Sequence, residues 1–152
     1  MMSVLLAYLH SLSMMAMAAL LFVQLLSIDG LVDRQQVERF VRFSFGVAAA
    51  AGVMLVSGVA LLVWPERSVV FYLRNPVFYI KLALFAAMIL IAISPARIIL
   101  QWHREESMGK LPERGTVFFV KRYLTAEAIL FLAIPLAASL SARGIGLQPS
   151  SS

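Results

Sequence analysis

Four long apolar segments, separated by charged stretches, limit what this chain can fold into. They cover about residues 3–26, 43–64, 77–94 and 118–140. A helix needs about 20 mostly apolar residues to cross the hydrocarbon core of a bilayer, and each segment comes close to that length. Because the segments are continuous and lack the alternation of barrel strands, they predict helices. The sequence therefore predicts an all-α integral membrane protein, with a four-helix bundle in residues 1–143 and a disordered tail at 144–152.

The composition of the 152 residues supports a membrane location. Hydrophobic residues make up 61% and charged residues 14%, whereas soluble domains have about 25% charged residues. The formal net charge is +5, but the basic residues lie between apolar segments and not on one soluble face. We therefore expect the lipid bilayer as a partner, and no nucleic acid. The chain has no cysteine, which excludes disulfides, thiolate metal sites and cysteine nucleophiles.

The distribution of Lys and Arg predicts an orientation. Nine of them accompany the first and third connections and three the opposite side, and cytoplasmic loops are the ones enriched in these residues. We expect a multi-pass protein of the bacterial inner (plasma) membrane with both termini on the periplasmic side. The first segment has no early Lys or Arg, unlike a cleaved signal peptide, and is predicted to be a retained helix.

Two polar residues are predicted to lie at one depth in the membrane. At the helical rise per residue, His10 is roughly 10 Å and Lys81 roughly 8 Å from the same membrane face. His10 can be a metal or haem ligand, or simply a buried histidine bonded to a neighbouring helix. Lys81 can face a cavity, as a second ligand or a partner for an anionic group, or extend to the interface with the nearby aromatic residues. Met14 and Met17 share the helical face of His10, and thioethers favour soft metals such as copper.

Glu127 is the third ionisable residue within an apolar segment. It is predicted to be roughly 20 Å from the periplasmic side, nearer the cytoplasmic half. Charged groups are costly in lipid, so a carboxyl here is either neutral or paired. Arg42 and Arg97 are the candidate partners, with Arg122 as another. Glu127 is thus predicted to be part of a buried ion pair or of a proton relay.

Small residues and prolines predict features of the helices. Gly46 and Gly52 occur at helical spacing with alanines, which allows close helix packing within the bundle or in a homo-oligomer. Ser94-Pro95 is predicted to bend or end the third helix, and Pro135 to kink the fourth. The stretch 29–42 is predicted to be an amphipathic lead-in to the second helix, 65–76 an interfacial segment, and 103–115 a solvated loop.

The motifs resemble an uncharacterised family of bacterial four-helix inner-membrane proteins, a domain of unknown function. The resemblance rests on Leu9-His10, on the stretch 71–84 with Asn75-Pro76 and Lys81-Leu82, and on further matches at Ser94-Pro95, Trp102-His103-Arg104, Glu127, Ile134-Pro135 and 142–146. The chain departs from the family at Arg42, where an acidic residue is common, and near Leu61, where an arginine is common. It is also distantly similar to the four-helix haem-binding protoporphyrinogen oxidase and to the copper-resistance D membrane proteins.

Three functions are compatible with these residues. A redox protein with b-type haem would use His10 and Lys81, and would need a membrane redox partner. A non-enzymatic accessory or assembly protein would use the polar residues only to specify packing. A copper-handling protein would use His10, Met14 and Met17. The sequence has none of the motifs of soluble enzymes, such as a phosphate loop or a paired-His zinc helix.

Overall fold

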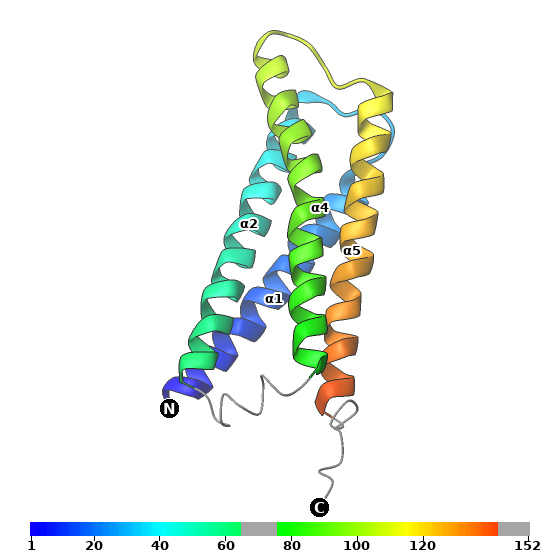
Figure 1. The fold of residues 1–152 in the computed structure, drawn as a ribbon. Coiled ribbons are helices and arrows are strands. Elements are labelled where there is room, and N and C mark those ends of the chain that lie inside the picture. Colours follow the sequence, from blue (N-terminus) through cyan, green and yellow to red (C-terminus); the bar gives the residue numbers. More distant parts are fainter. Residues whose placement is uncertain (65–75, 143–152) are drawn as a thin grey trace, which may run out of the picture.

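The computed structural model describes residues 1–64 and 76–142 of the chain, and these form four helices. The helices are α1 (Met2–Ser27), α2 (Arg34–Val63), α4 (Pro76–Ser107) and α5 (Arg114–Ala142). They run alternately up and down, so the beginning of α1 and the end of α5 lie at the same end of the bundle (Figure 1). The predicted all-α helical bundle is confirmed.

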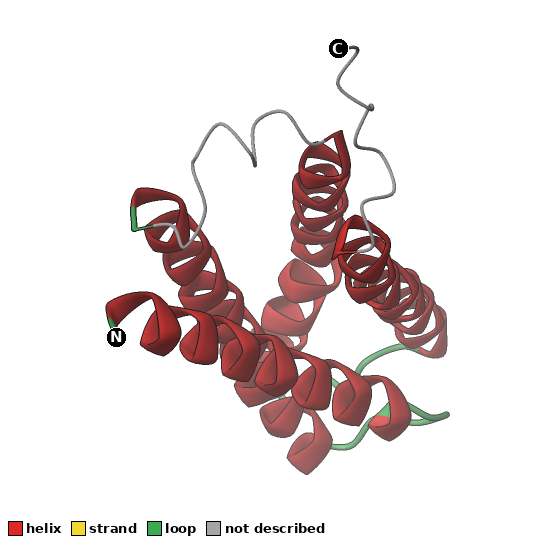
Figure 2. Ribbon diagram, turned by 90° about the horizontal axis from the view of Figure 1, so that it is seen from below, coloured by secondary structure: helices red, strands yellow, loops and turns green. Residues whose placement is uncertain are grey.

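The helices pack as two pairs. The principal contacts join α1 to α2 and α4 to α5, and smaller contacts of α2 with α4 and of α1 with α5 close the bundle. The pairs diverge toward the end where α1 begins, as Figures 1 and 2 show from two directions. The buried core is therefore concentrated toward the opposite end, where the connections 28–33 and 108–113 lie; it includes Phe40, Ile99, Trp102 and Val120.

A capping box fixes the residue at which α2 begins. Asp33 is its N-cap and accepts a hydrogen bond from the Gln36 backbone N–H at 2.7 Å, while the Gln36 side chain accepts one from the Asp33 N–H at 3.0 Å. Such a capping box satisfies amides that a helix start leaves without partners. The stretch before the second apolar segment is thus helical from Arg34, and it buries Val37 and Phe40. This agrees with the amphipathic lead-in predicted for it.

The third helix is longer than predicted. Pro95 does not end α4, which continues to Ser107, so residues 103–107 are helical and not part of a loop. A proline removes one hydrogen bond of a helix, and here the turns beyond it bury Ile99 and Trp102, at 0% and 2% exposure. This burial gives the helix a reason to continue past the proline. The turn that follows contains Gly109 at φ +79°, a conformation that favours glycine.

Three of the helices are long and apolar enough to cross a membrane: Met2–Ser27, Arg34–Val63, and the Phe78–Ser107 part of α4. That α5 is a fourth span stays a prediction. Many of their large apolar side chains face outward, for example Leu5 at 62%, Val56 at 69% and Leu90 at 67% exposure. A surface of this kind needs lipid to cover it. The predicted interfacial segment 65–76 lies almost wholly, and the tail 144–152 entirely, outside the described residues.

Candidate functional site

A cavity of about 320 Å³ lies between the four helices. This is near the lower end of the volumes usual for small-molecule sites. Its wall is almost entirely apolar, and the polar exceptions are Gln24, Ser44 and Glu127. The remaining lining residues come mainly from α2 and α4: Met17, Val47, Ala48, Ala51, Gly52, Leu55, Met88, Ile89, Ala92, Ile93, Pro95, Ala96, Ile99 and Leu124.

Glu127 borders this cavity from α5. The residue is 3% exposed, and no hydrogen bond or ion pair joins it to any other residue in the described part of the chain. No fully enclosed side-chain oxygen or nitrogen among the described residues lacks a partner. The Glu127 oxygens are therefore not sealed against apolar side chains but keep some surface, which faces the cavity. A buried carboxyl in this position is available to a guest in the cavity.

The arginines predicted to pair with Glu127 lie elsewhere. Arg42 contacts Glu38, one turn earlier on α2, with 3.5 Å between Nη2 and Oε2. Arg97 and Arg122 lie on exposed faces of α4 and α5. The predicted ion pair of Glu127 is absent from the described residues, because each arginine points away from the bundle interior.

A hydrogen-bonded pair of polar side chains also borders this cavity. The Gln24 side-chain amide of α1 donates a hydrogen bond to the Ser44 hydroxyl of α2, at 3.0 Å. Gln24 is 2% exposed. Its carbonyl oxygen and the Ser44 proton remain available to a guest. This pair was not predicted from the sequence, although a glutamine and a serine at similar depth in neighbouring apolar helices were a signal for it.

His10 is bonded to α2. Its Nδ1 lies 3.0 Å from the Met54 carbonyl oxygen and 3.2 Å from the Ser57 Oγ. A carbonyl only accepts, so Nδ1 carries the proton in this contact, and the Nε2 lone pair has no partner among the described residues. The backbone of Gly58 lies against the ring, since a Cβ on Gly58 would be 3.3 Å from His10 Cε1. Of the two alternatives predicted for His10, this contact corresponds to a buried histidine hydrogen-bonded to a neighbouring helix.

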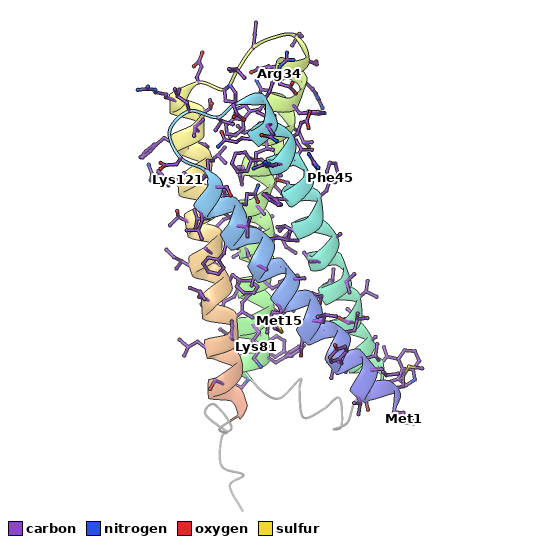
Figure 3. The ribbon with its side chains drawn as sticks, turned by 180° about the vertical axis from the view of Figure 1, so that it is seen from behind. Met1, Met15, Arg34, Phe45, Lys81 and Lys121 are labelled. Atoms are coloured by element: carbon purple, nitrogen blue, oxygen red, sulfur yellow. The ribbon has the colours of Figure 1, made fainter. Side chains whose placement is uncertain are left out.

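Among the described residues, no hydrogen bond or ion pair joins Lys81 to His10. It is half-buried near the lower end of α4, at the end of the bundle where Met1 lies (Figure 3). It forms no ion pair with a described residue. The principal neighbours of α1 are α2 and α5, so the equal depth of His10 and Lys81 does not by itself make them face each other.

The three candidate copper ligands have different surroundings. Met17 is 1% exposed and borders the cavity, whereas His10 is not among the lining residues. Met14 is half-buried. Among the described residues no group of three or more His, Asp or Glu side chains could hold a metal ion.

Charged side chains join the helices at the opposite end, where Arg34 and Lys121 lie (Figure 3). Arg34 Nε lies 3.2 Å from Glu106 Oε1, and Lys121 Nζ lies 3.6 Å from Asp29 Oδ1. His103, predicted to be solvated, is about half exposed and approaches Glu106 at 3.7 Å. Each pair has at least one well-exposed partner, so each contributes little to stability, about 1 kcal/mol at most.

Comparison with known proteins gives a family. The family described as "Predicted membrane protein (DUF2214)" matches residues 2–146. The chain belongs to this family. The resemblance inferred from the Asn-Pro and Lys-Leu motifs is thereby confirmed. No curated protein and no solved structure matches the chain, so the distant similarity to the haem oxidase and to the copper-resistance proteins is not supported.

Proposed function

We propose that this membrane protein binds a small, largely apolar molecule in the cavity between its helices, and that Glu127 recognises a hydrogen-bond donor on it. One observation carries the proposal: a carboxyl at 3% exposure borders a cavity of about 320 Å³ and has no partner among the described residues. Leaving a polar group desolvated and unpaired costs about 1–3 kcal/mol. A bound molecule that donates to Glu127 would remove that cost.

The apolar reagent N,N′-dicyclohexylcarbodiimide, which modifies carboxyl groups, tests whether the cavity admits a guest. The full chain in lipid vesicles is treated and the modified residues are mapped by mass spectrometry. We expect modification at Glu127, and none at this position in Glu127→Gln. A water-soluble carbodiimide is the matched reagent, and it should prefer Asp29 and Glu38, whose side chains are 91% and 55% exposed. Labelling by the apolar reagent that spares Glu127 would overturn the proposal.

The geometry of His10 supports haem binding as a second candidate. Histidines that bind metals commonly donate their other ring N–H to a carbonyl, as Nδ1 does to Met54. The free Nε2 could then be an axial ligand. An oxidised-minus-reduced absorption spectrum of the purified protein, from cells supplied with haem, tests this. A Soret band that is lost in His10→Ala supports the candidate, and a featureless wild-type spectrum rejects it.

The location and orientation of the protein are inferred from the distribution of its basic residues. We infer the bacterial inner membrane, with both termini periplasmic, because Lys and Arg accumulate on the side of the 28–33 and 108–113 connections. The Arg34 and Lys121 pairs described above lie on that side. If the protein binds haem, it would also need a membrane redox partner. If the small residues of α2 pack against a second copy of the chain, it would form a homo-oligomer.

A further inference from the structure

The cavity opens to the outside of the bundle between two of the described helices. Several of its lining residues are also exposed on the outer surface: Ala48, Gly52 and Leu55 of α2, and Ile89 and Ile93 of α4. The exposed fractions of Leu55, Ile89 and Ile93 are 47%, 37% and 40%. A residue that both borders the cavity and is exposed marks its mouth, so the mouth lies between α2 and α4. A Cβ on Gly52 would meet nothing within 4 Å, as expected at an opening.

On the other sides of the cavity, the described residues that lie next to it are buried. On the α1 and α5 side, Met17, Gln24, Leu124 and Glu127 are each at most 3% exposed. Toward the connections, the bundle is filled by the buried side chains of Phe40, Trp102 and Val120. Toward the other end, the buried layer consists of Met54, Phe85, Phe131 and Ile134. Among the described residues, Glu127 and Gln24 therefore lie at the back of a pocket whose exposed lining residues are those between α2 and α4.

The surroundings of the mouth identify the solvent it faces. The mouth lies in the apolar segments of α2 and α4, both of which are long and apolar enough to cross a membrane. At this depth the medium outside the mouth is hydrocarbon. A guest that enters here is dissolved in the bilayer, with its polar end directed to the back of the pocket.

The charges of the lining residues indicate which polar group of a guest the cavity can accept. No Lys or Arg borders the cavity, and its one ionisable side chain is Glu127. A phosphate group would meet no counter-charge and would be repelled by a carboxylate. A hydroxyl group suits the site, because it can donate to the Glu127 carboxyl or the Gln24 carbonyl and accept from the Ser44 hydroxyl. The volume suits a small head and not a sugar-bearing one.

We infer that the cavity takes the head of a neutral, hydroxyl-bearing lipid, such as a long-chain alcohol or a diacylglycerol, which enters from the bilayer between α2 and α4. This inference rests on the proposed function and adds to it the class of guest and its route. The rest of the lipid chain extends through the mouth into the hydrocarbon.

A photoreactive long-chain alcohol, with a diazirine close to its hydroxyl group, tests the inference. The full chain in phosphatidylcholine nanodiscs is irradiated with this probe, and the crosslinked residues are mapped by mass spectrometry. We expect crosslinks at the lining residues of α2, α4 and α5, and displacement by diacylglycerol but not by phosphatidic acid of the same chains. Displacement by phosphatidic acid alone would overturn the choice of lipid class.

Three variants separate the route from the site. Glu127→Leu removes the polar group, and labelling should fall about tenfold through the lost hydrogen bond. Gly52→Phe fills the mouth and should also suppress labelling. Ala49→Phe is the matched control, because Ala49 is exposed on the same helix but does not border the cavity; it should leave labelling unchanged.

The outcomes distinguish the two proposals. Labelling that depends on Glu127 but is unaffected by Gly52→Phe would overturn the route between α2 and α4 and leave the proposed function standing. Labelling at the cavity that neither variant changes would overturn both. Equal loss in Gly52→Phe and Ala49→Phe would assign the effect to the exposed face of α2 and would also overturn the route.

Discussion

At the scale of single residues, Glu127 and Gln24 border the same cavity but differ in their partners. Gln24 donates to Ser44 at 3.0 Å, whereas Glu127 has no partner among the described residues. Removing one member of a buried hydrogen bond leaves the other unsatisfied, while replacing an unpaired polar group by an apolar one of similar size removes a cost. The two residues are therefore expected to respond in opposite directions to substitution by leucine.

The prediction is that Glu127→Leu keeps or raises the stability of the protein, and that Gln24→Leu lowers it by about 1 kcal/mol. Thermal unfolding of the two variants and wild type in the same detergent measures this. Destabilisation by Glu127→Leu as large as that by Gln24→Leu would mean that Glu127 has a structural partner, and the cavity would lose its recognition group. If Glu127→Leu retains its stability but loses labelling by the photoreactive alcohol, Glu127 serves binding and not folding.

The same residues show what the sequence could predict about the site. Counting residues from the ends of the apolar segments gives an expected depth, and it singled out Glu127, His10 and Lys81 as polar residues predicted to lie within the membrane. It does not give the direction in which a side chain leaves its helix. That direction depends on how each helix is rotated against its neighbours. This is why Arg42 contacts Glu38 and not Glu127, and why the sequence could not choose between the two alternatives for His10, which contacts Met54.

At the scale of elements, the apolar segments were sufficient to predict helices, because a backbone in lipid has to satisfy its own hydrogen bonds. The ends of helices were harder to predict. The continuation of α4 past Pro95 depends on the burial of Ile99 and Trp102 against other helices, and local rules about proline do not include that burial. The cavity was missed for the same reason, since it is formed by four segments distant in sequence.

The two glycines of α2 that were predicted to allow close packing have different surroundings. A Cβ on Gly46 would lie 2.8 Å from Leu20 Cδ1 of α1, whereas a Cβ on Gly52 would meet nothing within 4 Å. Gly46→Leu is therefore expected to displace the Leu20 side chain and to destabilise the α1–α2 contact by about 1–3 kcal/mol. Gly52→Leu, its matched control on the same helix, should change stability by less than about 0.5 kcal/mol. Unfolding measurements in detergent compare them, and equal effects would contradict the assignment of Gly46 to the α1–α2 contact.

At the scale of the whole molecule, the orientation determines which side of the membrane each end of the bundle faces. The beginning of α1 and the end of α5 share one end, and the 108–113 connection lies at the other (Figure 1). The excess of Lys and Arg beside that connection predicts that it is cytoplasmic. Because the chain has no cysteine, single cysteines can report the side. We choose Met2→Cys and Met108→Cys, since Met2 and Met108 are 61% and 68% exposed.

A maleimide that cannot cross the inner membrane, applied to cells with a permeable outer membrane, should label Met2→Cys at once. It should label Met108→Cys only after the inner membrane is opened. The reverse pattern would place the termini in the cytoplasm and would show that the charge distribution had been misread. Immediate labelling of both would mean that the positions lie on the same side, which contradicts the three crossings expected of α1, α2 and α4. The pattern expected here would also fix the cytoplasmic side of the cavity as the side of Gln24 and Ser44, which lie toward the 28–33 connection.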